Sequence, residues 1–165
     1  MKLKIFRVFS VIILATFMLL IYNLSAETAA ESSKTSGGFS KMLLSLIYPD
    51  FDILSAEKQL ELISGISFFI RKTAHFTLYG MIGFWAQMSV ISYRKISFLA
   101  RNLIACAIAL AYAAFDEWHQ TFVNGRSGEL RDIFIDFLGA LTFICLSAVV
   151  MRCIKRIYRL VKTIN

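Results

Sequence analysis

Residues 116–136 read DEWHQTFVNGRSGELRDIFID and connect two long apolar runs of a 165-residue chain. The stretch holds five of the chain's eleven carboxylates, one of its two histidines and two of its arginines. Ionisable side chains that reach into a membrane are rare and generally serve a site. We therefore predict that this stretch forms the lip of a polar pocket at one face of a small membrane protein.

The composition supports a membrane protein, because 58% of the residues are hydrophobic and only 18% are charged. The apolar residues form runs, and about 20 residues are enough for a helix to cross a bilayer. We predict one all-α membrane domain over residues 1–165, a bundle of four transmembrane helices with a short interfacial helix between spans one and two. The expected spans cover about residues 5–24, 68–93, 98–117 and 132–151, with extracytoplasmic loops at 25–67 and 118–131.

The net charge of +7 would suggest a nucleic-acid partner for a soluble domain. In this chain the lysines and arginines lie mainly beside the apolar runs, where they orient the protein and contact anionic lipid headgroups. They form no basic stripe interleaved with aromatic residues. We therefore expect membrane lipids as partners and no binding of nucleic acid.

The first third of the chain leaves two alternatives open. A basic start followed by the apolar run from Val8 to Tyr22 favours a retained first span, and a cleaved secretory signal is the alternative. Residues 25–38 show no periodicity and are expected to form an exposed loop. Ser55 is the expected N-cap of a helix reaching Ile70, which lies either on the membrane surface or against the rest of the protein.

The distribution of charge predicts the topology. With four spans and both termini in the cytoplasm, eleven of the eighteen lysines and arginines lie on the cytoplasmic side. No carboxylate lies there, and all eleven fall on the outer side. Because basic residues near span ends stay in the cytoplasm, we predict a multi-pass protein of the cell membrane with both termini inside.

This topology brings the polar ends of three spans to one outer level. Arg71, His75 and Tyr79 share a helix face through their spacing of four residues. Asp136 lies about 6 Å deeper than Asp132, so its carboxylate must face protein or water. We expect the arginines to be offered to the aspartates. The predicted ligand-binding residues are Arg71, Lys72, His75, Tyr79, Asp116, Glu117, Gln120, Arg126, Asp132 and Asp136.

Each of these residues also has a purely structural interpretation. His75 would then bond a backbone carbonyl, Asp132 would cap the fourth span, and Glu117 would be solvated. Glycines inside the spans, at positions 80, 83 and 139, would allow helices to approach closely. The spacing of histidines, carboxylates and cysteines matches no metal motif, so no metal ligand is assigned.

Three motifs resemble the VanZ-like family of bacterial membrane proteins. They are RKTAHFxxY at residues 71–79, DEWHQxF at 116–122 and GRxGxxxDxxxDxxG at 125–139. The resemblance extends over nearly the whole chain. It implies an effect on susceptibility to teicoplanin, a lipoglycopeptide that acts at the cell surface. It carries over no catalytic residue.

Three functions follow as hypotheses. The first is a non-enzymatic surface protein whose pocket binds a lipid-linked cell-wall component or an amphiphilic glycopeptide, with Arg71 and Arg126 holding its phosphate or carboxylate. The second is a membrane enzyme, a hydrolase or transferase, acting on a lipid-linked envelope substrate with or without a divalent metal. The third, transport, conflicts with the scarcity of ionisable residues in the inner halves of the spans. The acid–base candidates of the enzyme hypothesis are His75, Asp116, His119 and Asp132.

Overall fold

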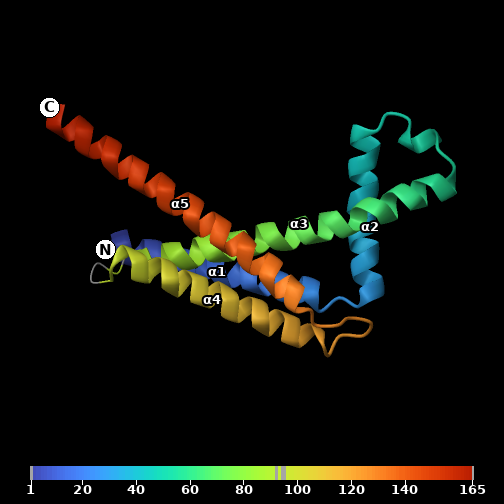
Figure 1. The fold of residues 1–165 in the computed structure, drawn as a ribbon, viewed down its shortest axis with the longest axis horizontal. Coiled ribbons are helices and arrows are strands. Elements are labelled where there is room, and N and C mark those ends of the chain that lie inside the picture. The colour runs from blue at the N-terminus through green and yellow to red at the C-terminus, as the bar shows by residue number, and fades with distance from the viewer. Residues whose placement is uncertain (1, 92, 94–95, 165) are drawn as a thin grey trace.

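The fold is entirely helical in the part of the chain that the computed structural model describes, residues 2–91, 93 and 96–164. The elements are α1 (Lys2–Ser25), α2 (Ala29–Ile47), the 3-10 turn η1 (Phe51–Ile53), α3 (Ala56–Ile91), α4 (Phe98–Gln120) and α5 (Leu130–Ile164). Helices α1, α3 and α4 run side by side, and α5 crosses α3 obliquely before its C-terminal half extends away from them (Figure 1). Helix α2 crosses α3 at a steep angle (Figure 1). The predicted all-α class is confirmed.

Three helices are long and apolar enough to cross a membrane: Leu3–Ser25, Phe98–Gln120 and Leu130–Arg159. Large apolar side chains such as Ile5, Leu103 and Leu146 are each more than half exposed on these helices. Outward-facing apolar surface of this kind is what lipid covers in a membrane protein. The structure therefore supports a membrane protein, while the count of four spans stays a prediction.

The segment before α3 differs from the predicted loop at residues 25–38, because α2 begins within it. Thr28 and Glu31 form a reciprocal capping box at the start of α2. Ser32, Ser36 and Ser40 are buried at a spacing of four residues, so the periodicity is carried by small polar residues rather than apolar ones. The hydroxyls of Ser36 and Ser40 donate to carbonyls of the preceding helical turn, as in the bond from Ser40 Oγ to the Ser36 carbonyl (2.7 Å).

The predicted short helix from Ser55 and the predicted second span form one continuous helix, α3, of 36 residues. Ser55 does cap its start, accepting a bond from the Lys58 amide (3.4 Å). The charged residues where the two predicted elements meet do not end the helix, because Arg71 bonds serines of α2 and Lys72 pairs with Asp132 of α5.

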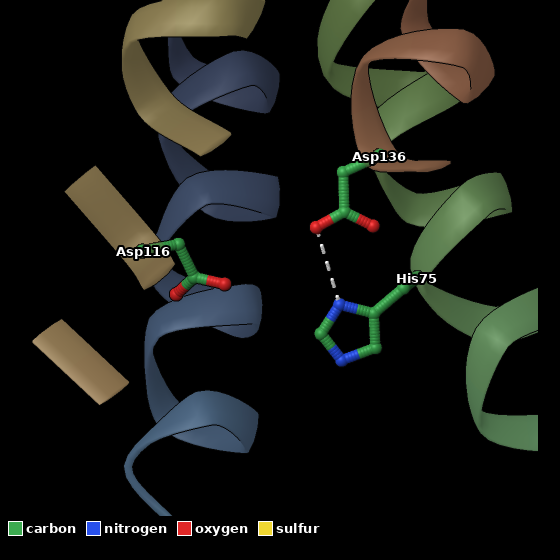
Figure 2. Close-up of side chains that lie close together, drawn as sticks. All are labelled: His75, Asp116 and Asp136. Carbon is green, nitrogen blue, oxygen red and sulfur yellow. Dashed lines mark ion pairs between the residues drawn. The ribbon is translucent and has the colours of Figure 1, made fainter. Parts of the chain in front are cut away.

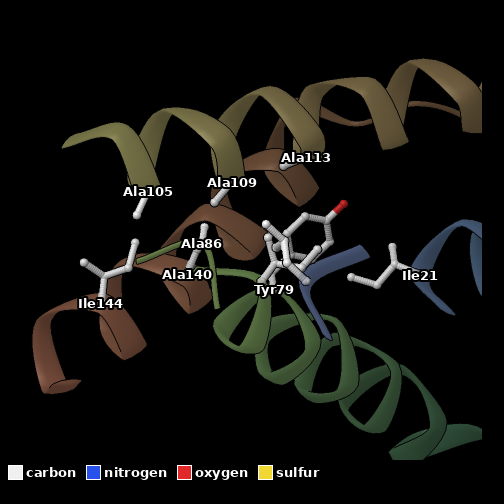
Figure 3. Packing of buried hydrophobic residues seen from close by; sticks show 10 residues of the cluster. Ile21, Tyr79, Ala86, Ala105, Ala109, Ala113, Ala140 and Ile144 are labelled. Carbon is white, nitrogen blue, oxygen red and sulfur yellow. The ribbon is translucent and has the colours of Figure 1, made fainter. Parts of the chain in front are cut away.

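Close packing of α3 against α5 depends on glycines, as predicted. A Cβ atom on Gly139 would lie 2.1 Å from the Phe76 carbonyl oxygen, and one on Gly83 would lie 2.7 Å from the Ala140 carbonyl oxygen. On α4, Ala105, Ala109 and Ala113 form a fully buried stripe facing the same core (Figure 3). Small side chains thus let three helix backbones approach closely.

Candidate functional site

The polar residues of α3, α4 and α5 meet at the end of the bundle where α1 and α4 finish and α5 begins (Figure 1). His75 comes from α3, Asp116 from the last turns of α4 and Asp136 from the second turn of α5. One donor atom of each lies within 4.8 Å of the others. In Figure 2 all three side chains point into the same space between the helices. We call these three residues the buried triad.

Asp136 is one of the two carboxylates of the triad and is 1% exposed. Its Oδ2 atom lies 3.6 Å from Nδ1 of His75, a distance that allows an ion pair when the imidazole is protonated but is too long for a hydrogen bond. Within the described residues this oxygen has no hydrogen-bond partner. The side chain faces protein, as predicted from its depth in the helix.

Asp116 is equally buried, and its two oxygens have different surroundings. Oδ2 accepts hydrogen bonds from Ser25 Oγ (3.0 Å) and Gln120 Nε2 (3.4 Å). Oδ1 has no partner among the residues that the structure describes. The pairing of Asp116 with Gln120 agrees with their spacing of four residues. Ser25 was missed, and only its place at the exit of the first apolar run could have suggested it.

Tyr79 closes the inner side of the triad. Its side chain is fully buried, and its ring stacks beside that of His75 with centroids 6.4 Å apart. Its hydroxyl is another polar atom without a hydrogen-bond partner in the described chain. Of the predicted α3 face formed by Arg71, His75 and Tyr79, the last two residues therefore point into the bundle.

Glu117 joins α4 to the start of α5. The residue is 3% exposed, so the alternative of a solvated side chain is wrong. Oε2 accepts from the Glu129 amide (2.9 Å) and Oε1 from Gln120 Nε2 (3.0 Å). The loop can come this close because Gly128 lacks a Cβ, which would lie 2.6 Å from the Glu117 carbonyl oxygen. Glu117 thus holds the loop in place.

Lys72 and Asp132 form an ion pair between α3 and α5, each about one-fifth exposed. Asp132 lies in the first turn of α5, which begins at Leu130, so it is not the N-cap. A carboxylate in that first turn still interacts favourably with the helix dipole.

The two arginines do not pair with the aspartates, contrary to expectation. Arg71 donates to the hydroxyls of Ser33 and Ser36 on α2 (3.5 and 3.4 Å). Arg126 donates to Gln120 Oε1 (3.1 Å) and the Leu24 carbonyl (3.3 Å). Neither forms an ion pair with a carboxylate among the described residues. Asp132 pairs with Lys72 and Asp136 lies beside His75. Both guanidinium groups therefore have neutral hydrogen-bond partners.

The charge of Arg71 acts on Arg126. Burial lowers the pKa of the Arg126 guanidinium, and the positive charge of Arg71 lowers that pKa further. The carboxylates of Glu27, Asp116 and Glu117 act on this pKa in the opposite direction, so the two arginines are hydrogen-bonded only to neutral groups but lie in a region of mixed charge. The serines of α2 that contact Arg71 could not be predicted from the sequence, because residues 25–38 lack the apolar periodicity of a helix.

His119, the second histidine, is not part of the triad. Its ring packs against Tyr22 with centroids 4.6 Å apart and lies beside Phe115 at 6.5 Å. Its Nδ1 atom is buried and has no partner in the described part of the chain. Of the four acid–base candidates, the structure therefore brings together only His75 and Asp116, and joins Asp136 to them.

A model of the VanZ/LLP1 family matches residues 8–152, which is most of the chain. The match includes every residue of the triad as well as Arg71 and Arg126. No curated protein and no solved structure matches the chain.

Proposed function

This chain belongs to the VanZ/LLP1 family, and we propose that it is a bacterial cell-surface membrane protein that binds an anionic, lipid-linked cell-wall component or an amphiphilic glycopeptide. Binding takes place at the outer polar end of the bundle and alters susceptibility to teicoplanin, as the family resemblance implies. The site residues predicted from the sequence act in this binding.

The observation that carries the proposal is the pair Arg71 and Arg126. Both guanidinium groups lack a carboxylate partner among the described residues, and they lie near enough to lower the pKa of Arg126. A guanidinium fork matches a phosphate or carboxylate through two parallel hydrogen bonds. An anionic headgroup bound by both arginines would reduce the repulsion between their positive charges. An arginine already paired with a carboxylate would gain less from such a ligand.

The orientation in the membrane supports an extracytoplasmic ligand. Both ends of the chain lie toward the same end of the bundle, opposite the triad (Figure 1). The basic residues before the first apolar run and after the last one therefore gather at that end. By the positive-inside rule this end is cytoplasmic, both termini are inside, and the arginine pair faces outward.

A membrane enzyme acting on a lipid-linked envelope substrate is the second candidate, favoured by the buried triad. An imidazole beside two carboxylates is a common arrangement for acid–base catalysis. The triad lies one or more helical turns below the outer charges, so a phosphate held by the arginines would place neighbouring atoms of the ligand near it. Turnover of a lipid-linked precursor would distinguish this function from binding alone.

The test is binding of a fluorescent lipid-linked cell-wall precursor to the purified protein in lipid nanodiscs. Charge-assisted hydrogen bonds contribute about 1.5–3 kcal/mol each, so Arg71→Ala and Arg126→Ala should each weaken binding roughly tenfold to a hundredfold. Arg131→Ala is the matched control, because Arg131 is 62% exposed and pairs with Glu129.

The same variants should lose their effect on teicoplanin susceptibility while the control keeps it. Membrane abundance must be equal for all four proteins. If Arg71→Ala and Arg126→Ala bind the precursor as tightly as Arg131→Ala does, the arginine pair is not the binding site. Release of a hydrolysed or transferred product by the intact protein would replace the binding function by the enzymatic one.

A further inference from the structure

We propose that the buried triad of His75, Asp116 and Asp136 is a binding site for a divalent transition-metal ion. The inference goes beyond the binding of an anionic ligand and does not rest on it. Its three ligands come from three helices and lie far apart in sequence, so no local metal motif could reveal them.

The distances among the donor atoms fit a shared ion. Metal bonds to imidazole nitrogen and carboxylate oxygen are about 2.0–2.2 Å, which places neighbouring tetrahedral donors roughly 3.4 Å apart. Nδ1 of His75 and Oδ2 of Asp136 are 3.6 Å apart, and all three donors fall within 4.8 Å. These atoms are spaced too widely for hydrogen bonds and closely enough for one ion, with a small inward movement of Asp116.

Unpartnered buried atoms point to the same ligand. Asp116 and Asp136 are each 1% exposed, yet Asp116 Oδ1 and Asp136 Oδ2 accept no hydrogen bond from the described residues. Both carboxylates point into the space that they share with His75 (Figure 2). Buried carboxylate oxygens are rarely left without a partner, because desolvation without compensation is costly. A cation supplies the missing partner for both.

The surroundings of Asp116 resemble those of a metal ligand. Ser25 Oγ donates to Oδ2 at 3.0 Å and Gln120 adds a longer bond to the same atom. These bonds fix the carboxylate and leave Oδ1 free to face the triad. Hydrogen bonds to the non-coordinating atom of a ligand are the usual means of orienting it.

Charge completes the argument. Two carboxylates with donor atoms within 4.8 Å repel one another strongly in a buried space. The nearby Lys72 is already engaged with Asp132. A dication bound by two carboxylates and a neutral imidazole makes a neutral site. One imidazole with two carboxylates favours zinc, manganese or iron over magnesium and calcium, which prefer oxygen ligands alone.

Three protein ligands leave at least one coordination position for water or a ligand atom. The position would face the space between α1, α3, α4 and α5 that the outer arginines overlie. A metal here would therefore contact an anionic group only if that group reaches below the arginines. Metal binding itself requires no such ligand, so it can be measured alone.

The test is metal analysis of the protein purified from bacterial membranes through an affinity tag that contains no histidine. After treatment with a chelator and reloading with Zn²⁺, we expect one ion per chain. Asp116→Asn and Asp136→Asn should each weaken Zn²⁺ binding at least tenfold. Glu129→Gln is the matched control, because Glu129 lies near the same end of the bundle but is 46% exposed and outside the triad.

A second variant guards against loss of folding. His75→Cys replaces the imidazole by a thiolate, so the Co²⁺-loaded variant should gain a sulfur-to-cobalt absorption band in the near ultraviolet that the Co²⁺-loaded original protein lacks. Equal Zn²⁺ affinity of the intact protein and the Asp116→Asn/Asp136→Asn double variant would overturn the proposal. So would a Co²⁺ spectrum of His75→Cys identical to that of the original protein.

Discussion

Replacing Gly139 by alanine should force α5 away from α3. The added Cβ would lie 2.1 Å from the Phe76 carbonyl oxygen, 2.8 Å from its carbonyl carbon and 3.0 Å from its Cα. All three atoms belong to the backbone of α3, so no side chain can rotate aside. The helices must separate by roughly 1 Å or more to restore ordinary contact distances.

The magnitude follows from two opposing terms. Overpacking a tight contact costs about 1–3 kcal/mol, and a clash with backbone belongs at the upper end of that range. Alanine is also the better helix former by about 1 kcal/mol. We therefore expect Gly139→Ala to lower the free energy of unfolding by about 2 kcal/mol.

Gly65→Ala is the matched control, because Gly65 lies in α3 and a Cβ there would meet nothing within 4 Å. That variant should gain up to about 1 kcal/mol from helix propensity alone. Unfolding in mixed micelles with increasing SDS, followed by far-ultraviolet circular dichroism, measures both variants. The two free energies should differ by about 3 kcal/mol. If Gly139→Ala is as stable as Gly65→Ala, the close approach of α3 and α5 described above is incorrect.

Three further predictions concern other parts of the molecule. Thr28→Val removes the side-chain acceptor at the start of α2 and should cost about 1 kcal/mol, seen as faster amide exchange over residues 29–33; unchanged exchange would contradict the capping box. Lys72→Met should destabilise the protein more than Lys72→Met/Asp132→Asn does, because the single change leaves a carboxylate that is only one-fifth exposed without its partner; equal losses would mean that the pair is not coupled. A cysteine at exposed position 127 should react with an impermeant maleimide in whole cells, in a background without Cys106, Cys145 and Cys153; labelling only after permeabilisation would reverse the predicted topology.

Spacing within a helix was a reliable guide to this site. It correctly related Asp116 to Gln120 and identified glycines as points of close approach, because both depend on local helix geometry. It also assigned Asp136 to the protein interior, since a carboxylate in an apolar helix has few alternatives. These inferences needed no knowledge of how the helices are rotated about their axes.

The partners across helices could not be predicted in the same way. The sequence predicts arginines as partners of the aspartates, yet Lys72 and His75 are the residues that pair with aspartates of α5, because the rotation of α3 turns them toward it. The apolar pattern of the sequence does not predict helix α2, because its buried stripe consists mainly of serines. Ser25 bonds Asp116 and Ser36 bonds Arg71, and only the three-dimensional structure brings these residues together.

The length of α3 has a mechanical consequence. His75 and Gln87 lie twelve residues apart, about 18 Å along one helix. At the far position Gln87 bonds Asn102 of α4 and accepts from Ser147 of α5. The chain's one proline, Pro49, lies outside the helix, so no proline kink absorbs a twist between the two positions. Both positions therefore belong to one uninterrupted helix, so a rotation of α3 at His75 would also displace Gln87, and a spectroscopic probe at Asn102 would report whether the two ends of the helix move together.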